Sequence, residues 1–146
     1  MEKKDGFIVD SSVVTKWFLI EDGSEQAVEV RNRFATRRIA LTVPTLLFYE
    51  VVNALRFSGA FDEADLATAA KSLSKYQFEV WRPMGNLLEE AARLAVSKDI
   101  TAYDASYVAL AKRKRSRLLT EDGELLEKFP SLTLSLRRFS RAEGQV

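Results

Sequence analysis

Short apolar runs alternate with helix-type segments along the whole chain, and this alternation restricts the fold more than any other feature. The runs lie at residues 6–10, 39–44, 77–83, 117–120 and 132–136. Between them, apolar residues recur at every third or fourth position, which is typical of helices. Strands separated by helices are joined by right-handed crossovers and form a parallel sheet with both faces covered. We therefore predict an α/β fold: an α/β/α sandwich of three layers with a mainly parallel central sheet.

The helical segments have recognisable starts, among them Ser24 and the N-cap residue Asp62. We predict helices at residues 11–20, 24–38, 45–57, 62–76, 87–99, 100–114 and 123–129. Residues 142–146 lack a pattern and are expected to form a loose tail. No linker or internal repeat interrupts the chain, so the 146 residues are interpreted as a single domain, 1–146.

Composition limits the chemistry that the chain can perform. It contains no cysteine and no histidine, which excludes disulfides, thiolate nucleophiles, imidazole bases and the usual zinc ligands. Any catalysis must therefore depend on acids. The N-terminus lacks the apolar core of a signal peptide and no uncharged stretch could span a membrane, so we expect a cytoplasmic protein without a membrane partner.

Two aspartates follow predicted strands. Asp10 ends the run 6–10, and Asp122 comes two residues after the run 117–120. In parallel sheets, ligands bind at the carboxyl ends of the strands, near the topological switch point. Each aspartate also fits a structural role, because either could cap the helix that follows it.

Asp104 lies at the start of a predicted helix, on the face that carries core-type residues. Tyr107 and Val108 share this face at three and four residues along. The alternative is a capping box, in which Thr101 caps the helix and Asp104 is its acidic partner. The position therefore allows both a functional and a structural role.

Glu50 lies at the rim of the apolar arc of its helix, beyond Ala54. Asn53 is the neighbouring polar residue on that flank, suited to hold the carboxylate or a bound water. A surface glutamate that merely borders the core is the alternative.

The four acids could converge at one edge of the sheet. Clustered carboxylates repel one another, which raises their pKa values unless a divalent cation neutralises them. With oxygen ligands alone, the expected cation is Mg²⁺ or Mn²⁺. Such an ion permits phosphodiester hydrolysis without histidine.

Four segments together resemble a known family. They are IVDSSVV (8–14), YEVVNAL (49–55), ITAYDASYVALAK (100–112) and LLTEDGEL (118–125). Their order and spacing resemble those of PIN-domain nucleases, most closely the VapC toxins of toxin-antitoxin pairs. The resemblance implies a PIN-like sandwich and a metal-dependent endoribonuclease that cleaves single-stranded RNA. It also implies inhibition by a cognate antitoxin and a homodimer, for which the helices between Thr45 and Tyr76 offer apolar surface.

The resemblance also implies roles for individual residues. The catalytic and metal-binding acids are Asp10, Glu50, Asp104 and Asp122. The accessory polar residues are Ser11, Ser12, Asn53 and Thr120. Glu121 stands beside Asp122, and spacing alone does not exclude it as a ligand. Two other functions remain open: an RNA-processing PIN nuclease without an antitoxin, and a non-catalytic RNA-binding module.

Two further features allow either a structural or an RNA-binding role. The basic run KRKRSR (112–117) includes the end of the Asp104 helix, where cations complement the helix dipole or contact phosphate. Trp17 is expected in the core or an interface, with base stacking as the alternative.

Overall fold

The computed structural model describes residues 4–144. Its centre is a five-stranded, fully parallel sheet in the order β3-β2-β1-β4-β5. The strands are β1 (Asp5–Val9), β2 (Ile39–Pro44), β3 (Glu79–Trp81), β4 (Arg117–Leu119) and β5 (Thr133–Leu134). The predicted parallel α/β architecture is thus confirmed.

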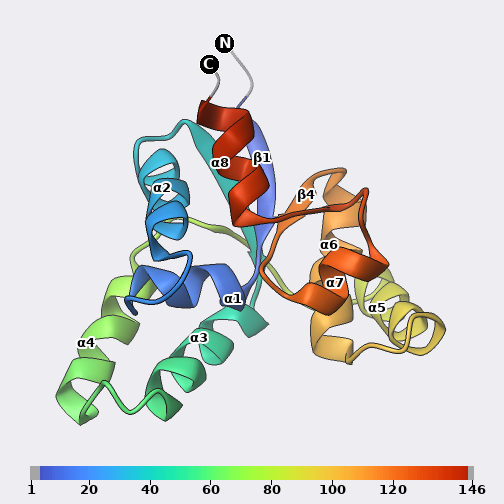
Figure 1. The fold of residues 1–146 in the computed structure, drawn as a ribbon. Helices are drawn as coiled ribbons and strands as arrows, with labels where there is room; N and C mark the ends of the chain where they lie inside the picture. The colour runs from blue at the N-terminus through green and yellow to red at the C-terminus, as the bar shows by residue number, and fades with distance from the viewer. Residues whose placement is uncertain (1–3, 145–146) are drawn as a thin grey trace.

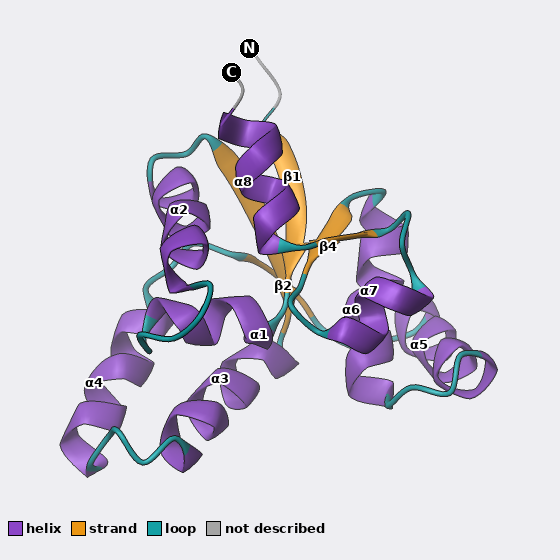
Figure 2. Ribbon diagram, viewed as in Figure 1, coloured by secondary structure: helices purple, strands orange, loops and turns teal. Residues whose placement is uncertain are grey.

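Helices cover both faces of the sheet. In Figure 1, α2 and α8 lie on one side and α5, α6 and α7 on the other, and Figure 2 shows the strands between these layers. The helices are α1 (Ser11–Val14), α2 (Ser24–Ala35), α3 (Leu46–Phe57), α4 (Glu63–Ser74), α5 (Asn86–Ser97), α6 (Ala102–Lys114), α7 (Gly123–Lys128) and α8 (Leu136–Gly144), with a 3₁₀ turn η1 (Thr15–Trp17) after α1. This arrangement is the three-layer sandwich that the sequence predicts.

The core explains why the central strands are apolar throughout. In β2, all residues except Ala40 are buried, as expected for a strand covered on both faces. On one face α6 packs against β1, β2 and β4, and its Val108 and Leu110 are both fully buried. On the other, Phe139 of α8 contacts Phe7 of β1 edge to face, with ring centroids 5.5 Å apart.

The strand order creates a switch point beside β1. The chain passes from β1 to β2 and β3 in one direction, then returns to β4 on the other side of β1. The ends of β1 and β4 lie side by side, since Val9 pairs with Leu119 and the Asp10 amide donates to the Leu119 carbonyl at 3.2 Å. The carboxyl ends of β1 and β4 are therefore the expected position for a ligand.

Some local predictions were wrong. The run 132–136 is a strand only at Thr133–Leu134, and Leu136 begins the helix α8 instead. Residues 142–144, expected in a loose tail, belong to α8; residues 145–146 lie outside the described part. Ala54, expected in the buried arc of α3, is exposed.

Trp17 is buried, with 7% of its surface exposed, and stacks on Phe78 with ring centroids 6.0 Å apart. Its predicted core position is confirmed, so its ring is closed to base stacking. Among the described helices, none combines the length and apolarity required to cross a membrane.

Candidate active site

Asp10 is the most buried of the four predicted acids. It follows β1 directly and caps α1, accepting hydrogen bonds at Oδ1 from the Ser12 amide (3.1 Å) and hydroxyl (2.5 Å). The Thr120 hydroxyl donates to its other oxygen, Oδ2. Burial raises the pKa of Asp10 to about 7, although these hydrogen bonds oppose the rise. The side chain is thus rigidly held at a site where its negative charge is poorly solvated.

Two hydroxyl groups tie Asp10 to the loop after β4. The Thr120 Oγ1 accepts from the Asp122 amide at 3.0 Å, and the Ser12 Oγ accepts from the Glu121 amide at 2.9 Å. Residues more than a hundred positions apart in the sequence are therefore joined at the switch point. The sequence identified these hydroxyls as accessory groups, and the structure brings both to the Asp10 carboxylate.

Glu50 reaches the same edge from α3. The buried Tyr107 of α6 donates its hydroxyl to Glu50 Oε1 at 2.6 Å, and Ser11 supplies a second hydrogen bond. Burial raises the pKa of Glu50, and the nearby charge of Asp104 adds to the rise. The carboxylate is half-buried, which agrees with the predicted position at the rim of the apolar arc.

Asp104 lies in the first turn of α6. Thr101 caps this helix: its hydroxyl oxygen accepts from the Asp104 amide at 3.0 Å, and the hydroxyl also bonds to the Asp104 carboxylate. Thr101 is thus the cap that the sequence predicts, but within residues 4–144 no hydrogen bond runs from the Thr101 amide to Asp104, as a full capping box would require. The pKa of Asp104 is raised mainly by burial, and repulsion from the charges of Asp122 and Glu124 raises it further. The Asp104 carboxylate is thus half-buried among other negative charges.

Asp122 and Glu121 diverge although they are adjacent. Asp122 caps α7, accepting from the Leu125 amide at 3.0 Å, and its charge acts on Asp104. Glu121 is turned toward α8, where its Oε2 lies 3.4 Å from the Leu136 amide. The geometry therefore favours Asp122 over Glu121 as a member of the acidic group.

The four acids come from β1, α3, α6 and the loop before α7. Tyr107 lies beside Glu50, to which its hydroxyl donates at 2.6 Å. Burial and then the charge of Glu50, with Asp10 and Asp104 contributing, raise the pKa of Tyr107 well above its usual range. Within residues 4–144, none of the four carboxylates forms an ion pair with lysine or arginine. Their negative charge is therefore not balanced by any basic side chain of the part that the structure describes.

The donor chemistry fits a hard divalent cation, because every available group is an oxygen and the charge is unbalanced. The side chains are nevertheless not arranged as a closed ligand shell. Among the described residues, no three acids are close enough to hold one ion as they stand. Ligation of one ion by these acids would therefore require their side chains to rearrange.

Tyr107 was missed as a site residue by the sequence reasoning, which treated it only as part of an apolar face. A signal existed, because a buried tyrosine hydroxyl needs a partner. Asn53 is exposed, and no hydrogen bond joins it to Glu50 in the described part of the chain. It lines a hollow of about 530 Å³ beside Glu50, together with Tyr49 and Tyr103.

Comparison with known proteins decides the family. The model of the PIN domain matches residues 7–130, which is most of the chain. The chain belongs to the PIN-domain family. Among its relatives is ribonuclease VapC3 of Pyrobaculum aerophilum, 33% identical over 130 residues that cover 86% of this chain and 95% of the relative. Exonuclease VapC9 of the same organism is 34% identical over 99 residues, covering 66% and 73%.

Solved structures agree with this PIN-domain assignment. PAE2754 from Pyrobaculum aerophilum superposes with a TM-score of 0.71 at 25% identity, covering 99% of this chain and all of that one. A toxin-antitoxin complex from Klebsiella pneumoniae gives a TM-score of 0.67 at 15% identity, covering 89% and 97%. At that identity the second likeness shows the fold alone.

Proposed function

We propose that this PIN-domain protein is a VapC-type toxin of the cytoplasm, an endoribonuclease that cleaves single-stranded RNA with Mg²⁺ or Mn²⁺. The observation that carries the proposal is the group of four carboxylates at the switch point. The pKa values of Asp10, Glu50 and Asp104 are raised, and within residues 4–144 none of the four acids pairs with a lysine or arginine. The relative named ribonuclease VapC3 supports the same chemistry. The acids Asp10, Glu50, Asp104 and Asp122 would hold the cation.

The surrounding residues would keep the carboxylates in place during the reaction. Ser12 and Thr120 donate to opposite oxygens of Asp10, so neither oxygen can rotate freely. Tyr107 and Ser11 hold Glu50 in the same way. A bound divalent cation supplies polarisation of a phosphoryl oxygen and activation of water, which replaces the missing histidine. Asp104 and Asp122, each with one side-chain hydrogen bond, would complete the group.

The hollow beside Glu50 supports an RNA substrate. Tyr49 and Tyr103 are 81% and 62% exposed on its walls, and aromatic rings beside a phosphate site can stack on unpaired bases. Asn53 and Arg56 line the same hollow and offer hydrogen-bond donors to a base and to phosphate.

Asp104→Asn tests the proposal. With Mn²⁺ and single-stranded RNA, the wild-type protein should cleave and the variant should not, because the substitution removes a charge from the ligand set. The exposed Asp22→Asn serves as the matched control and should cleave normally. RNA blocked at both ends separates internal cleavage from the exonuclease activity named for VapC9. Equal cleavage by the wild type and Asp104→Asn would refute the assignment.

A cognate antitoxin and a homodimer are part of the proposal. The solved toxin-antitoxin complex with this fold supports the first. The apolar helices between Thr45 and Tyr76, with Phe57 70% exposed at the end of α3, support a self-association surface. Growth arrest on expression, relieved by a co-expressed neighbouring gene product, would distinguish a toxin from an RNA-processing nuclease.

A further inference from the structure

Two hollows lie at the amino ends of the strands, at the edge of the sheet opposite the four acids. Their volumes are about 640 and 870 Å³, and they share Lys4, Ala40 and Glu79. Together they border the first residues of β1, β2, β3 and β4, which are consecutive neighbours in the sheet. We refer to these two hollows as the amino-edge groove.

Positive charge dominates the amino-edge groove. Its basic side chains are Lys4, Arg37, Lys75, Lys114, Arg115 and Arg117, and its acidic ones are Asp5 and Glu79. Lys114 already neutralises Glu79, with Nζ 2.7 Å from the carboxylate. Within residues 4–144, the other five basic groups form no ion pair. The groove therefore presents several cations that no acidic side chain among the described residues pairs with.

Two of the groove arginines occupy unfavourable backbone positions. Arg37 and Arg115 follow the ends of α2 and α6 with φ angles of 63° and 50°, in the left-handed region where glycine fits best. The dipole of α6 does not require an arginine at position 115, because Lys112 and Arg113 already supply positive charge within the last turn of this helix. The arginine side chains at these two positions thus require another explanation.

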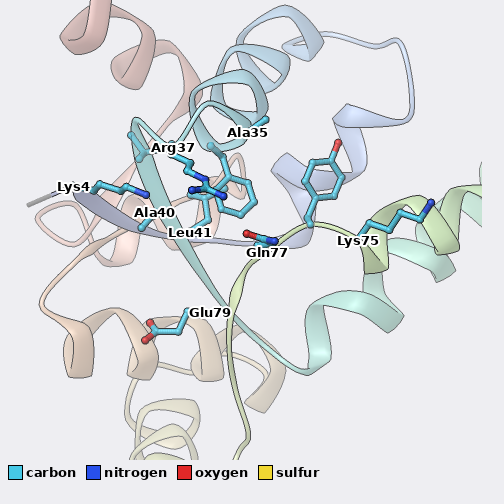
Figure 3. Close-up of a pocket in the computed structure, with 11 residues that line it drawn as sticks. Lys4, Ala35, Arg37, Ala40, Leu41, Lys75, Gln77 and Glu79 are labelled. Atoms are coloured by element: carbon cyan, nitrogen blue, oxygen red, sulfur yellow. The ribbon is translucent and has the colours of Figure 1, made fainter.

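Aromatic and amide groups accompany the cations. The half-buried rings of Phe34 and Tyr76 line the smaller hollow together with Gln77. Figure 3 shows Arg37 extending over β2 and Lys75 at the opposite end of this hollow. Both rings also pack on Phe78, with ring centroids 5.1 and 5.9 Å from it, so the groove offers RNA its spaced cations for phosphate contact and the Gln77 amide for hydrogen bonds.

We propose that the amino-edge groove binds the phosphodiester backbone of RNA and retains a long substrate while the opposite edge cleaves it. This inference rests on the proposed ribonuclease function. The two edges are separated by the length of β1, five residues or about 17 Å. A long RNA could therefore contact both edges, while a short oligonucleotide bound at the acids would leave the groove empty.

Binding and cleavage are measured separately to test this. RNA affinity is measured in the Asp104→Asn protein, the background for the binding variants, which should not cleave its ligand. The ligand is a fluorescent single-stranded RNA of about 30 nucleotides, and the affinity is measured across a series of salt concentrations. Arg37→Gly with Arg115→Gly is added, because glycine removes both charges and also relieves both left-handed positions. The control is Lys71→Gln with Arg93→Gln, which removes two exposed charges outside the groove.

The groove variant should bind the long RNA about tenfold more weakly at low salt. The slope of log K against log salt should flatten by roughly 0.7 for each lost phosphate contact. The control should change little, and melting temperatures should stay near that of the background. In the cleavage-competent protein, the groove substitutions should raise KM for long RNA, leaving kcat and the cleavage of a short oligonucleotide unchanged.

Unchanged RNA affinity and salt slope in the groove variant would overturn the inference, as would an effect confined to a poly-glutamate peptide. Groove-dependent binding without any cleavage by the wild type would instead refute the proposed nuclease and leave the groove assignment standing. Normal cleavage by the wild type, with an RNA affinity that the groove substitutions leave unchanged, would refute the groove assignment and leave the proposed nuclease standing.

Discussion

Replacing Asp10 with asparagine should stabilise the metal-free protein at alkaline pH although it destroys the proposed site. Burial raises the Asp10 pKa from 3.8 to about 7. Each pKa unit corresponds to about 1.4 kcal/mol, so holding the ionised group in the fold costs about 4 kcal/mol. Asparagine removes this penalty but gives weaker hydrogen bonds with Ser12 and Thr120. The net gain should be about 2–3 kcal/mol, or roughly 5–10 °C in melting temperature.

The pH dependence has a definite sign. The folded-state pKa lies above that of the unfolded chain, so the folded protein binds more protons between about pH 4 and 7. The free energy of unfolding of the wild type should therefore fall as pH rises through this window. Asp10→Asn should lack that decline. At about pH 5 only about 1.6 kcal/mol of the wild-type penalty remains, because the unfolded chain is still ionised there, and the weaker hydrogen bonds of asparagine should cancel this remainder.

Thermal melts at about pH 5 and about pH 8, with chelator and with Mn²⁺, provide the assay. Mn²⁺ should raise the melting temperature of the wild type at the higher pH and leave Asp10→Asn unaffected. Asp22→Asn, an exposed change of the same type, should behave as the wild type. The reasoning would be refuted if Asp10→Asn had a lower melting temperature than the wild type at about pH 8. It would also be refuted if the difference in melting temperature between the two proteins were the same at both pH values.

Other perturbations give equally definite outcomes. Tyr107→Phe removes the hydroxyl that holds Glu50, so cleavage should fall about tenfold or more with a loss of only about 1 kcal/mol in denaturant unfolding; wild-type kinetics would exclude the positioning role. Asp122→Asn should abolish Mn²⁺-dependent cleavage while Glu121→Gln retains it, and the opposite ranking would exchange their roles. Chelation with EDTA should stop cleavage by the wild type and Mn²⁺ should restore it; cleavage that persists without divalent ions would contradict the metal requirement.

The apolar pattern fixed the architecture because burial on both faces makes a strand recognisable without tertiary information. The strand β2 (Ile39–Pro44) has the predicted bounds, and α2 begins at Ser24 as predicted. The pattern failed at the C-terminus, where the alternating apolar residues of LTLSL continue into an amphipathic helix. Leu136 satisfies both periodicities, and only its burial together with Phe139 of α8 decides between them.

The sequence by itself determined the parallel sheet, the types of acid present and their order along the chain, because these follow from local pattern and composition. The tertiary structure decided which neighbours those acids have. Hydrogen bonds join Asp10 to Thr120 across 110 residues and Glu50 to Tyr107 across 57. The backbone also turns Glu121 away from its neighbour Asp122. Spacing along a chain cannot specify such directions, since they depend on the crossover that places β4 beside β1.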